Sequence, residues 1–317
     1  MAYRLDPTQP TATEVRRALA EQLGRAAREL RVEGGPSAEG IHEVRKRIKK
    51  ARSLLRLARA DVGTGVARHA NAELRRVGAD LARQRDADAL VEAVDRLLDH
   101  LADPDAEPAL EPATADALGR VRTVLAERAE AVRAGDAIDP AVVRTAARTL
   151  EQLVTWLDRV PAHAEGWDAL GPGLARSHRR GRAAFAALPD EPSAEQLHEW
   201  RKRVKDLWYQ QRLLRRLWPD AQRPVIEAAD RLADVLGQEH DLAALVDVLA
   251  AVDDHGAPSL AVDEADRDLV VAVADARRAD LQAVARDLGT RLYADHERAW
   301  ERRHGAWWGA ASGGATA

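Results

Sequence analysis

The sequence contains two similar stretches, Ile41–Ala60 with IHEVRKRIKKARSLLRLARA and Leu197–Arg216 with LHEWRKRVKDLWYQQRLLRR. At about 100° per residue, the apolar side chains of the first stretch fall between about 160° and 260° around a helix axis. The basic side chains fall between about 280° and 40°, on a strip roughly 21 Å long beside and opposite the apolar face. The second stretch repeats this pattern. Both stretches are therefore predicted to be amphipathic helices, each with one core face and one basic strip.

The two stretches belong to an internal repeat that extends beyond them. An offset of 156 residues superposes them, and an offset of 155 then aligns Leu81–Val94 with Leu236–Leu249. The repeat predicts two copies of one helical unit, which we place at residues 1–161 and 162–308, followed by a flexible tail at residues 309–317. The identical charged pairs of the two stretches are His42 and His198, Glu43 and Glu199, Arg45 and Arg201, Lys46 and Lys202, Arg47 and Arg203, Lys49 and Lys205, and Arg56 and Arg212.

The composition predicts an all-α fold. Ala, Leu, Arg, Glu and Asp dominate, and β-branched runs bounded by turn residues are scarce. A chain of 317 residues is long enough for two domains. Pro161–Pro172 has the Pro and Gly content of a join between them. Apolar periodicity and helix breakers predict helices near 12–31, 38–61, 65–101, 112–133 and 140–160 in the first half, and near 172–188, 193–217, 220–252, 262–287 and 289–308 in the second.

The overall charge excludes a general attraction to nucleic acid or lipid. The net charge is −4, so any site for a polyanion must be local. No cysteine is present, which removes disulfides and thiolate metal sites. Since no apolar run is long enough to span a membrane and the amino terminus lacks the core of a signal peptide, we expect a cytoplasmic protein with no membrane partner.

The lysines mark where such a local site would lie. The chain has five lysines against 43 arginines, and all five fall in the two similar stretches. From residue 42 to residue 59 there are eight Lys or Arg and one acid, Glu43. One interpretation is a solvated basic face that acids on neighbouring helices balance. The other is a phosphate-binding strip, because lysine supplies mobile point charges and arginine a fork for phosphate oxygens.

The motif HxxRKxxKK followed by RxxLRL, repeated as LHEWRKRVKDLWYQQRLL, resembles the CHAD family. SHRRGRAAF, LADVLGQEHDLAAL and LGTRLYADHERAWERR follow in the family's order, and the resemblance extends over about residues 12–308. It implies two tandem four-helix bundles that face each other around a basic central cavity. It also implies a non-enzymatic protein that binds inorganic polyphosphate, with targeting to polyphosphate granules, and that stands alone without a CYTH domain. No cofactor, metal or catalytic residue is implied.

The family's basic positions, carried over one by one, give the expected polyphosphate contacts. Two sets come from the repeated helices, Arg179, Arg180 and Arg182 come from the helix that opens the second copy, and Arg85 and His240 come from the turn before an acidic residue. The opening helix of the first copy has no RRGR equivalent. The two sets from the repeated helices are His42, Arg45, Lys46, Lys49, Arg52 and Arg56, and His198, Arg201, Lys202, Lys205 and Arg212.

Three other functions compete with polyphosphate binding. The doublet His240-Asp241 is also found in metal-dependent phosphohydrolases, but its repeat counterpart is Arg85-Asp86, and a guanidinium does not ligate a metal. RNA or general polyanion binding would use the basic helix together with Trp208 and Tyr209 for base stacking. Granule proteins are further candidate partners, for which the chain would act as an adaptor. The oligomeric state and the involvement of divalent cations stay open.

Overall fold

The computed structural model describes residues 3–81, 85–103, 111–135, 138–252 and 259–313. Within these ranges the regular structure consists of twelve helices and no strand, which confirms the all-α class. The helices are α1 (Thr11–Glu29), α2 (Ala38–Leu57), α3 (Arg59–Val62), α4 (Thr64–Asp80), α5 (Arg85–Leu101), α6 (Pro112–Gly135), α7 (Pro140–Asp158), α8 (Gly166–Ala186), α9 (Ala194–Leu214), α10 (Pro219–Ala250), α11 (Glu264–Leu292) and α12 (Glu297–Gly313).

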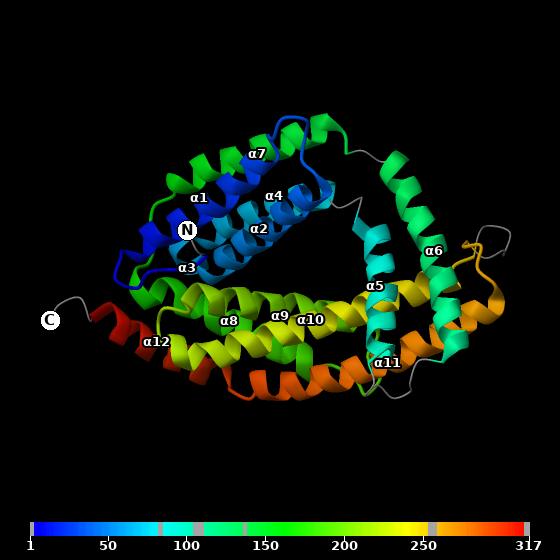
Figure 1. Cartoon of the computed structure of the whole chain (residues 1–317). Coiled ribbons are helices and arrows are strands. Elements are labelled where there is room, and N and C mark those ends of the chain that lie inside the picture. Colours follow the sequence, from blue (N-terminus) through cyan, green and yellow to red (C-terminus); the bar gives the residue numbers. More distant parts are fainter. Residues whose placement is uncertain (1–2, 82–84, 104–110, 136–137, 253–258, 314–317) are drawn as a thin grey trace.

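The helices form two layers (Figure 1). In the first layer α1 packs on α2 and α7, and α4 packs on the same two helices. In the second, α9 packs between α8 and α10, while α12 lies against α8. Helices α5 and α6 pack on each other and reach the second layer, where they contact α10 and α11. The layers also touch directly, because α2 contacts both α8 and α9, and α3 contacts α8.

The two repeated helices begin in the same way. Ser37 caps α2 by accepting a hydrogen bond from the Gly40 amide at 3.1 Å. Ser193 caps α9 in a capping box, in which Gln196 accepts a hydrogen bond from the Ser193 amide in return. Such caps stabilise a helix start by about 1 kcal/mol. Both helices therefore start within one residue of their predicted positions.

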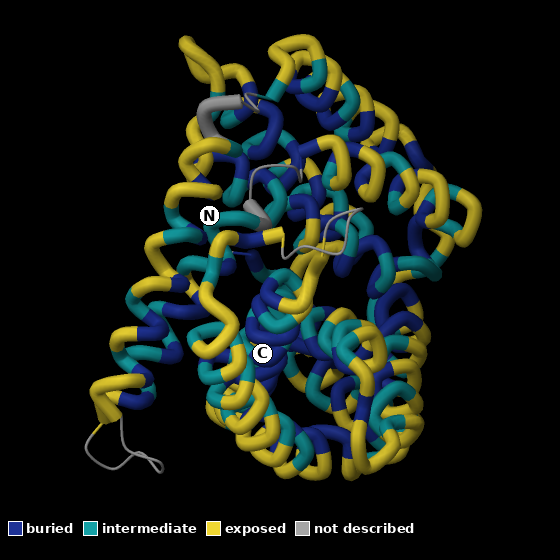
Figure 2. Tube along the Cα trace, turned by 90° about the vertical axis from the view of Figure 1, so that its right-hand side faces the viewer, coloured by how far each residue is buried: buried dark blue, intermediate teal, exposed yellow. Residues whose placement is uncertain are grey.

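The predicted apolar faces form the core. Val44 and Ile48 of α2 are buried, as are Trp200 and Val204 of α9. Buried and exposed residues alternate along the helices throughout the molecule (Figure 2), as expected where each helix turns one stripe inward. Within the described residues, no helix is sufficiently long and apolar to cross a membrane.

Several predicted helix boundaries are wrong. The helix predicted to start at 289 begins later, because α11 continues to Leu292 and α12 spans Glu297–Gly313, which includes the first residues of the predicted tail. The helix predicted over 65–101 is divided into α4 and α5, whereas its repeat counterpart α10 runs unbroken for 32 residues. The join predicted at Pro161–Pro172 is shorter, because α8 already starts at Gly166 and includes Pro172. The next residue, Gly173, lies where α8 contacts the end of α2. A Cβ atom on Gly173 would lie 1.9 Å from the Leu57 carbonyl oxygen, so no larger residue fits there. Here glycine serves close helix packing and not a turn.

Candidate functional site

The basic strips of the two copies meet where α2 contacts α9. Ser53 Oγ of α2 donates a hydrogen bond to the Asp206 carbonyl of α9 at 3.4 Å. One turn further along α2, the Arg56 guanidinium forms an ion pair with the Asp206 carboxylate, which is buried. This pair joins residues 150 positions apart in the sequence. We call this region the crossing; it comprises Lys50, Arg52, Ser53 and Arg56 of α2 and Arg203, Asp206 and Arg212 of α9.

Asp206 is a single carboxylate among several cations. Arg203 Nη1 lies 3.7 Å from it. The pKa of Arg52 is lowered to about 10, first by burial and then by the charges of Arg56 and Arg75, while Asp206 opposes them. The pKa of Arg180 on α8 is lowered by burial and then by Arg203. Cations of both copies thus share one carboxylate and repel one another.

Arg52 is a half-buried cation with a buried nitrogen, Nε, that lacks a hydrogen-bond partner among the described residues. Neither Arg52 nor Arg180 forms an ion pair there. Buried polar groups are normally satisfied, so an unpartnered guanidinium nitrogen needs an explanation. A bound anion would provide one.

A second cationic contact lies at the same crossing. The repeat aligns Lys50 with Asp206 and Arg56 with Arg212. The pKa of Lys50 is lowered to about 8, first by burial and then by Arg212, the strongest of the charges acting on it. The Lys50 ammonium lies 5.8 Å from the centre of the Tyr3 ring, and the Arg212 guanidinium lies 4.8 Å from the Trp208 ring. In the described part of the chain, neither cation forms an ion pair.

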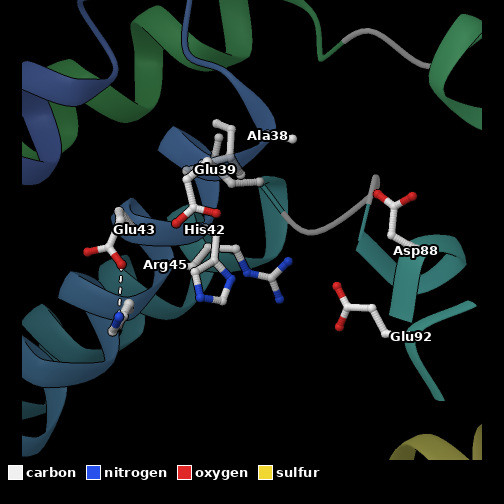
Figure 3. A pocket seen from close by; sticks show the side chains of 10 residues that line it. Ala38, Glu39, His42, Glu43, Arg45, Asp88 and Glu92 are labelled. Atoms are coloured by element: carbon white, nitrogen blue, oxygen red, sulfur yellow. Dashed lines mark hydrogen bonds and ion pairs between the residues drawn. The ribbon is translucent and has the colours of Figure 1, made fainter. Parts of the chain in front are cut away.

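The outer ends of the two strips carry more balanced charge. Lys46 pairs with Glu43 at 2.9 Å, and Lys202 pairs with its repeat counterpart Glu199. A cavity of about 340 Å³ lies between α2 and α5 (Figure 3). His42 and Arg45 line it from α2, and Asp88 and Glu92 line it from α5. The start of the first strip therefore faces carboxylates.

At the outer end of the strip on α9, His198 lies beside His240 of α10. The ring centres of His198 and His240 are 4.6 Å apart. The pKa of His198 is lowered to about 4, first by burial and then by His240, Lys202 and Arg201. Arg201 lies along α10, because a Cβ on Gly237 would be 2.9 Å from its Nη2. The motif LADVLGQEHD thus places a glycine where the arginine needs room.

Two lysines and three arginines complete the predicted set. Lys205 Nζ lies 3.7 Å from Asp234 and 4.6 Å from the Trp208 ring centre, and burial lowers its pKa. Arg179 and Arg182 are exposed on α8, on either side of Gly181. A Cβ on Gly181 would lie 2.5 Å from the Tyr293 hydroxyl oxygen, so this glycine accommodates the tyrosine. Lys49 is exposed on α2. Arg85 begins α5, and its side chain lies outside the described part of the structure.

Two histidines near the predicted basic positions differ in their surroundings. His178 is buried and stacks on Trp300 with ring centres 4.7 Å apart, and burial lowers its pKa to about 4. His178 therefore packs in the core. His296 is exposed, with Nε2 3.4 Å from the Glu297 carboxylate.

Four members of the crossing were not among the predicted contacts: Lys50, Ser53, Arg203 and Asp206. The sequence held one signal for them. Asp206 is the position at which the second copy has an acid and the first copy has a lysine. Its importance depends on the contact between α2 and α9.

The carboxylate of the His240-Asp241 doublet has a partner in the first copy. Arg96 of α5 donates a hydrogen bond to Asp241 at 2.7 Å, across 145 residues of sequence. In the described ranges no three His, Cys, Asp or Glu residues are grouped so that they could hold a metal ion. Asp241 thus forms part of the contact between α5 and α10.

The comparisons with known proteins agree with this arrangement. The family model described as the CHAD domain matches residues 7–250, and the chain belongs to the CHAD family. Among solved structures the chain is similar to PptA from Streptomyces chartreusis, with 17% sequence identity and a TM-score of 0.56 over 90% of this chain and 100% of that one. At this identity the likeness shows the fold alone. No curated protein matches the sequence.

Proposed function

We propose that the chain binds inorganic polyphosphate along the two basic strips, with the crossing as the centre of the site. The buried, unpartnered Arg52 Nε carries this proposal, since it lies beside Arg56, Arg75 and Arg203 with one carboxylate between them. Membership of the CHAD family supports it, because binding of polyphosphate is the general role of that family.

The ligand would act by replacing the missing negative charge. Polyphosphate carries about one charge per phosphate, and arginine forks bind phosphate oxygens in pairs. Each phosphate that approaches Arg52 or Arg180 would reduce the repulsion that lowers their pKa values. Binding releases counterions, so the affinity should fall steeply with salt. Two facing four-helix bundles, divided after residue 161 and lining a basic cavity, form the architecture that we propose for this ligand.

The other functions have less support. Trp208 is buried between Lys205 and Arg212, and Trp200 is buried completely, so neither presents a face for base stacking. RNA or general polyanion binding is the second candidate, because phosphates of any source would interact with the same cations. We propose a role without catalysis, cofactor or metal, in the cytoplasm and at polyphosphate granules, where an adaptor role would add protein partners.

Calorimetric titration with medium-chain polyphosphate, and with single-stranded RNA of equal charge, tests the proposal. Saturable binding of polyphosphate alone is expected. Loss of both Arg52 and Arg180, as the double alanine variant, should weaken it by about tenfold or more, because a charge-assisted hydrogen bond contributes about 1.5 to 3 kcal/mol. Arg291→Ala is the matched control, since Arg291 is 74% exposed on α11. Equal losses in both variants, or equal binding of RNA, would reduce the site to diffuse attraction.

A further inference from the structure

The crossing contains two pairs of residues that the repeat relates to each other and that differ in charge. Arg56 of the first copy pairs with Asp206 of the second. The repeat-related residues are Arg212 of the second copy and Lys50 of the first, whose charges repel each other. The first pair has the Asp206 carboxylate where the second pair has the Lys50 ammonium group. One of the two therefore holds an anion already, and the other does not.

Two acids that act on Lys50 and Arg212 also interact with other residues. Glu43, the acid that acts on Lys50, forms its hydrogen bond with Lys46. Burial and Asp234 raise the pKa of Asp230 on α10, and Lys205 and Arg212 oppose them. No ion pair neutralises either cation within the described ranges. Both are half-buried, so a small anion can reach them.

Hydrogen bonds to the backbone fix α2 and α9 beside Lys50 and Arg212. The Tyr3 hydroxyl donates a hydrogen bond to the Lys50 carbonyl at 2.8 Å, and the Leu5 amide donates one to the Leu213 carbonyl at 2.9 Å. The Tyr3 ring meets the Tyr209 ring edge-on at 6.2 Å. The segment before α1 therefore ties α2 to α9 beside the two cations. The backbones of α2 and α9 are therefore fixed here before any ligand arrives.

We propose that Lys50 and Arg212 form a subsite for one phosphate group, which takes the place that the Asp206 carboxylate has in the related contact. A phosphate offers several oxygens, which suit the arginine fork on one side and the lysine ammonium on the other. The subsite bridges the two copies and rests on the proposed function. The phosphate is either an internal unit of a chain or a free orthophosphate ion.

The substitution Lys50→Asp tests the subsite by giving the first copy the acid of the second. The new carboxylate pairs with Arg212, so the variant should melt at a higher temperature than the wild type without ligand. Its affinity for medium-chain polyphosphate should fall about tenfold or more, as expected when an attractive contact becomes a repulsive one. Lys50→Gln removes the charge without adding an acid, and should lose affinity without the gain in melting temperature. Arg291→Gln is the control.

The results separate the subsite from the proposed function. If the wild type binds polyphosphate and both Lys50 variants bind it within about twofold of the wild type, the subsite is wrong and the proposed function stands. If the wild type does not bind polyphosphate, both are wrong. Melting curves show that each variant is folded.

A direct measurement uses the small number of lysines. Five lysines give few side-chain signals in an NMR spectrum of the wild type, and Lys50→Arg assigns the one of interest. Tripolyphosphate should shift the Lys50 signal and raise the pKa of its ammonium group. If orthophosphate has the same effect at the same concentration, the subsite takes single phosphates; a weaker effect shows a preference for a chain. An unchanged Lys50 signal, while the Lys46 or Lys202 signal moves, would overturn the subsite.

Discussion

Helices α2 and α9 share their basic positions but differ in what surrounds them. On α9, Arg203 has Glu199 and Asp206 within reach, and Lys205 faces Asp234. On α2, Lys50 and Arg52 have no ion-pair partner among the described residues, and the pKa values of both are lowered. The exchange of a lysine for an aspartate between copies changes the local charge by two units. A repeat can therefore preserve its cations and still leave different ones without an ion-pair partner in its two copies.

The strongest way to break this difference is to make the two copies alike with Asp206→Lys. The substitution removes the buried partner of Arg56 and adds a cation to Arg52, Arg180 and Arg203. Losing one partner of a buried ion pair costs about 3 kcal/mol or more. Urea unfolding measures the change. Asp234→Lys is the control, since Asp234 is 67% exposed, and should cost less than about 1 kcal/mol. Similar losses would show that the buried pair does not hold the crossing together.

A pH profile sharpens the difference between Lys50 and its counterpart. With a pKa of about 8, Lys50 loses its charge in the free protein between pH 7 and 9. A bound phosphate favours the charged amine, so polyphosphate affinity should fall as the pH rises through this window. The fall is at most about tenfold at pH 9, one unit above the pKa. Lys50→Arg, which stays charged, should flatten the profile in calorimetric titrations. A slope that survives this change would assign the titration to another group.

The loss of stability at acid pH should come mainly from buried histidines of the second copy. The histidines whose pKa burial lowers to about 4 are His178, His198 and His304. In the unfolded chain they take up protons near pH 6.5. Protonation thus favours unfolding, and stability should be full above about pH 6.5 and decrease towards pH 4. Melting curves across this range should show a smaller decrease for His178→Phe. His69→Phe, at an exposed position on α4, should behave as the wild type; an unchanged decrease in His178→Phe would remove that residue from the effect.

The smallest expected effect concerns the helix starts. Ser193→Ala removes the hydrogen bond that the Ser193 hydroxyl accepts from the Gln196 amide, and it leaves the backbone amide of residue 193 free to donate to Gln196. Ser37→Ala removes the hydrogen bond that the Ser37 hydroxyl accepts from the Gly40 amide. Each should lower the free energy of unfolding by about 1 kcal/mol, because each variant loses one hydrogen bond to a serine hydroxyl. Urea titration of both variants measures this. A larger loss at Ser37 would indicate that α2 depends more on its start than α9 does.

The sequence predicted those features that depend on local periodicity. The core faces of α2 and α9 and their starts after Ser37 and Ser193 follow from apolar spacing and capping residues. The predicted helix over 65–101 did not show that α4 ends at Asp80. The predicted join did not show that Gly173 packs on the backbone of α2. Both features depend on how the helices pack. The repeat identified the basic strips. It could not show that Asp206 neutralises Arg56, because only the contact between α2 and α9 brings them together.

At Gly173, α8 lies directly on the backbone at the end of α2. A Cβ there would be 2.7 Å from the Arg56 carbonyl oxygen as well as 1.9 Å from that of Leu57. The missing side chain therefore sets how closely Arg56 approaches the second layer. A methyl group at this position would act as a wedge that separates the cations of the two copies without altering any charge. For the proposed polyphosphate site, the spacing of phosphates would then be a mechanical property, set by the smallest residue near the crossing.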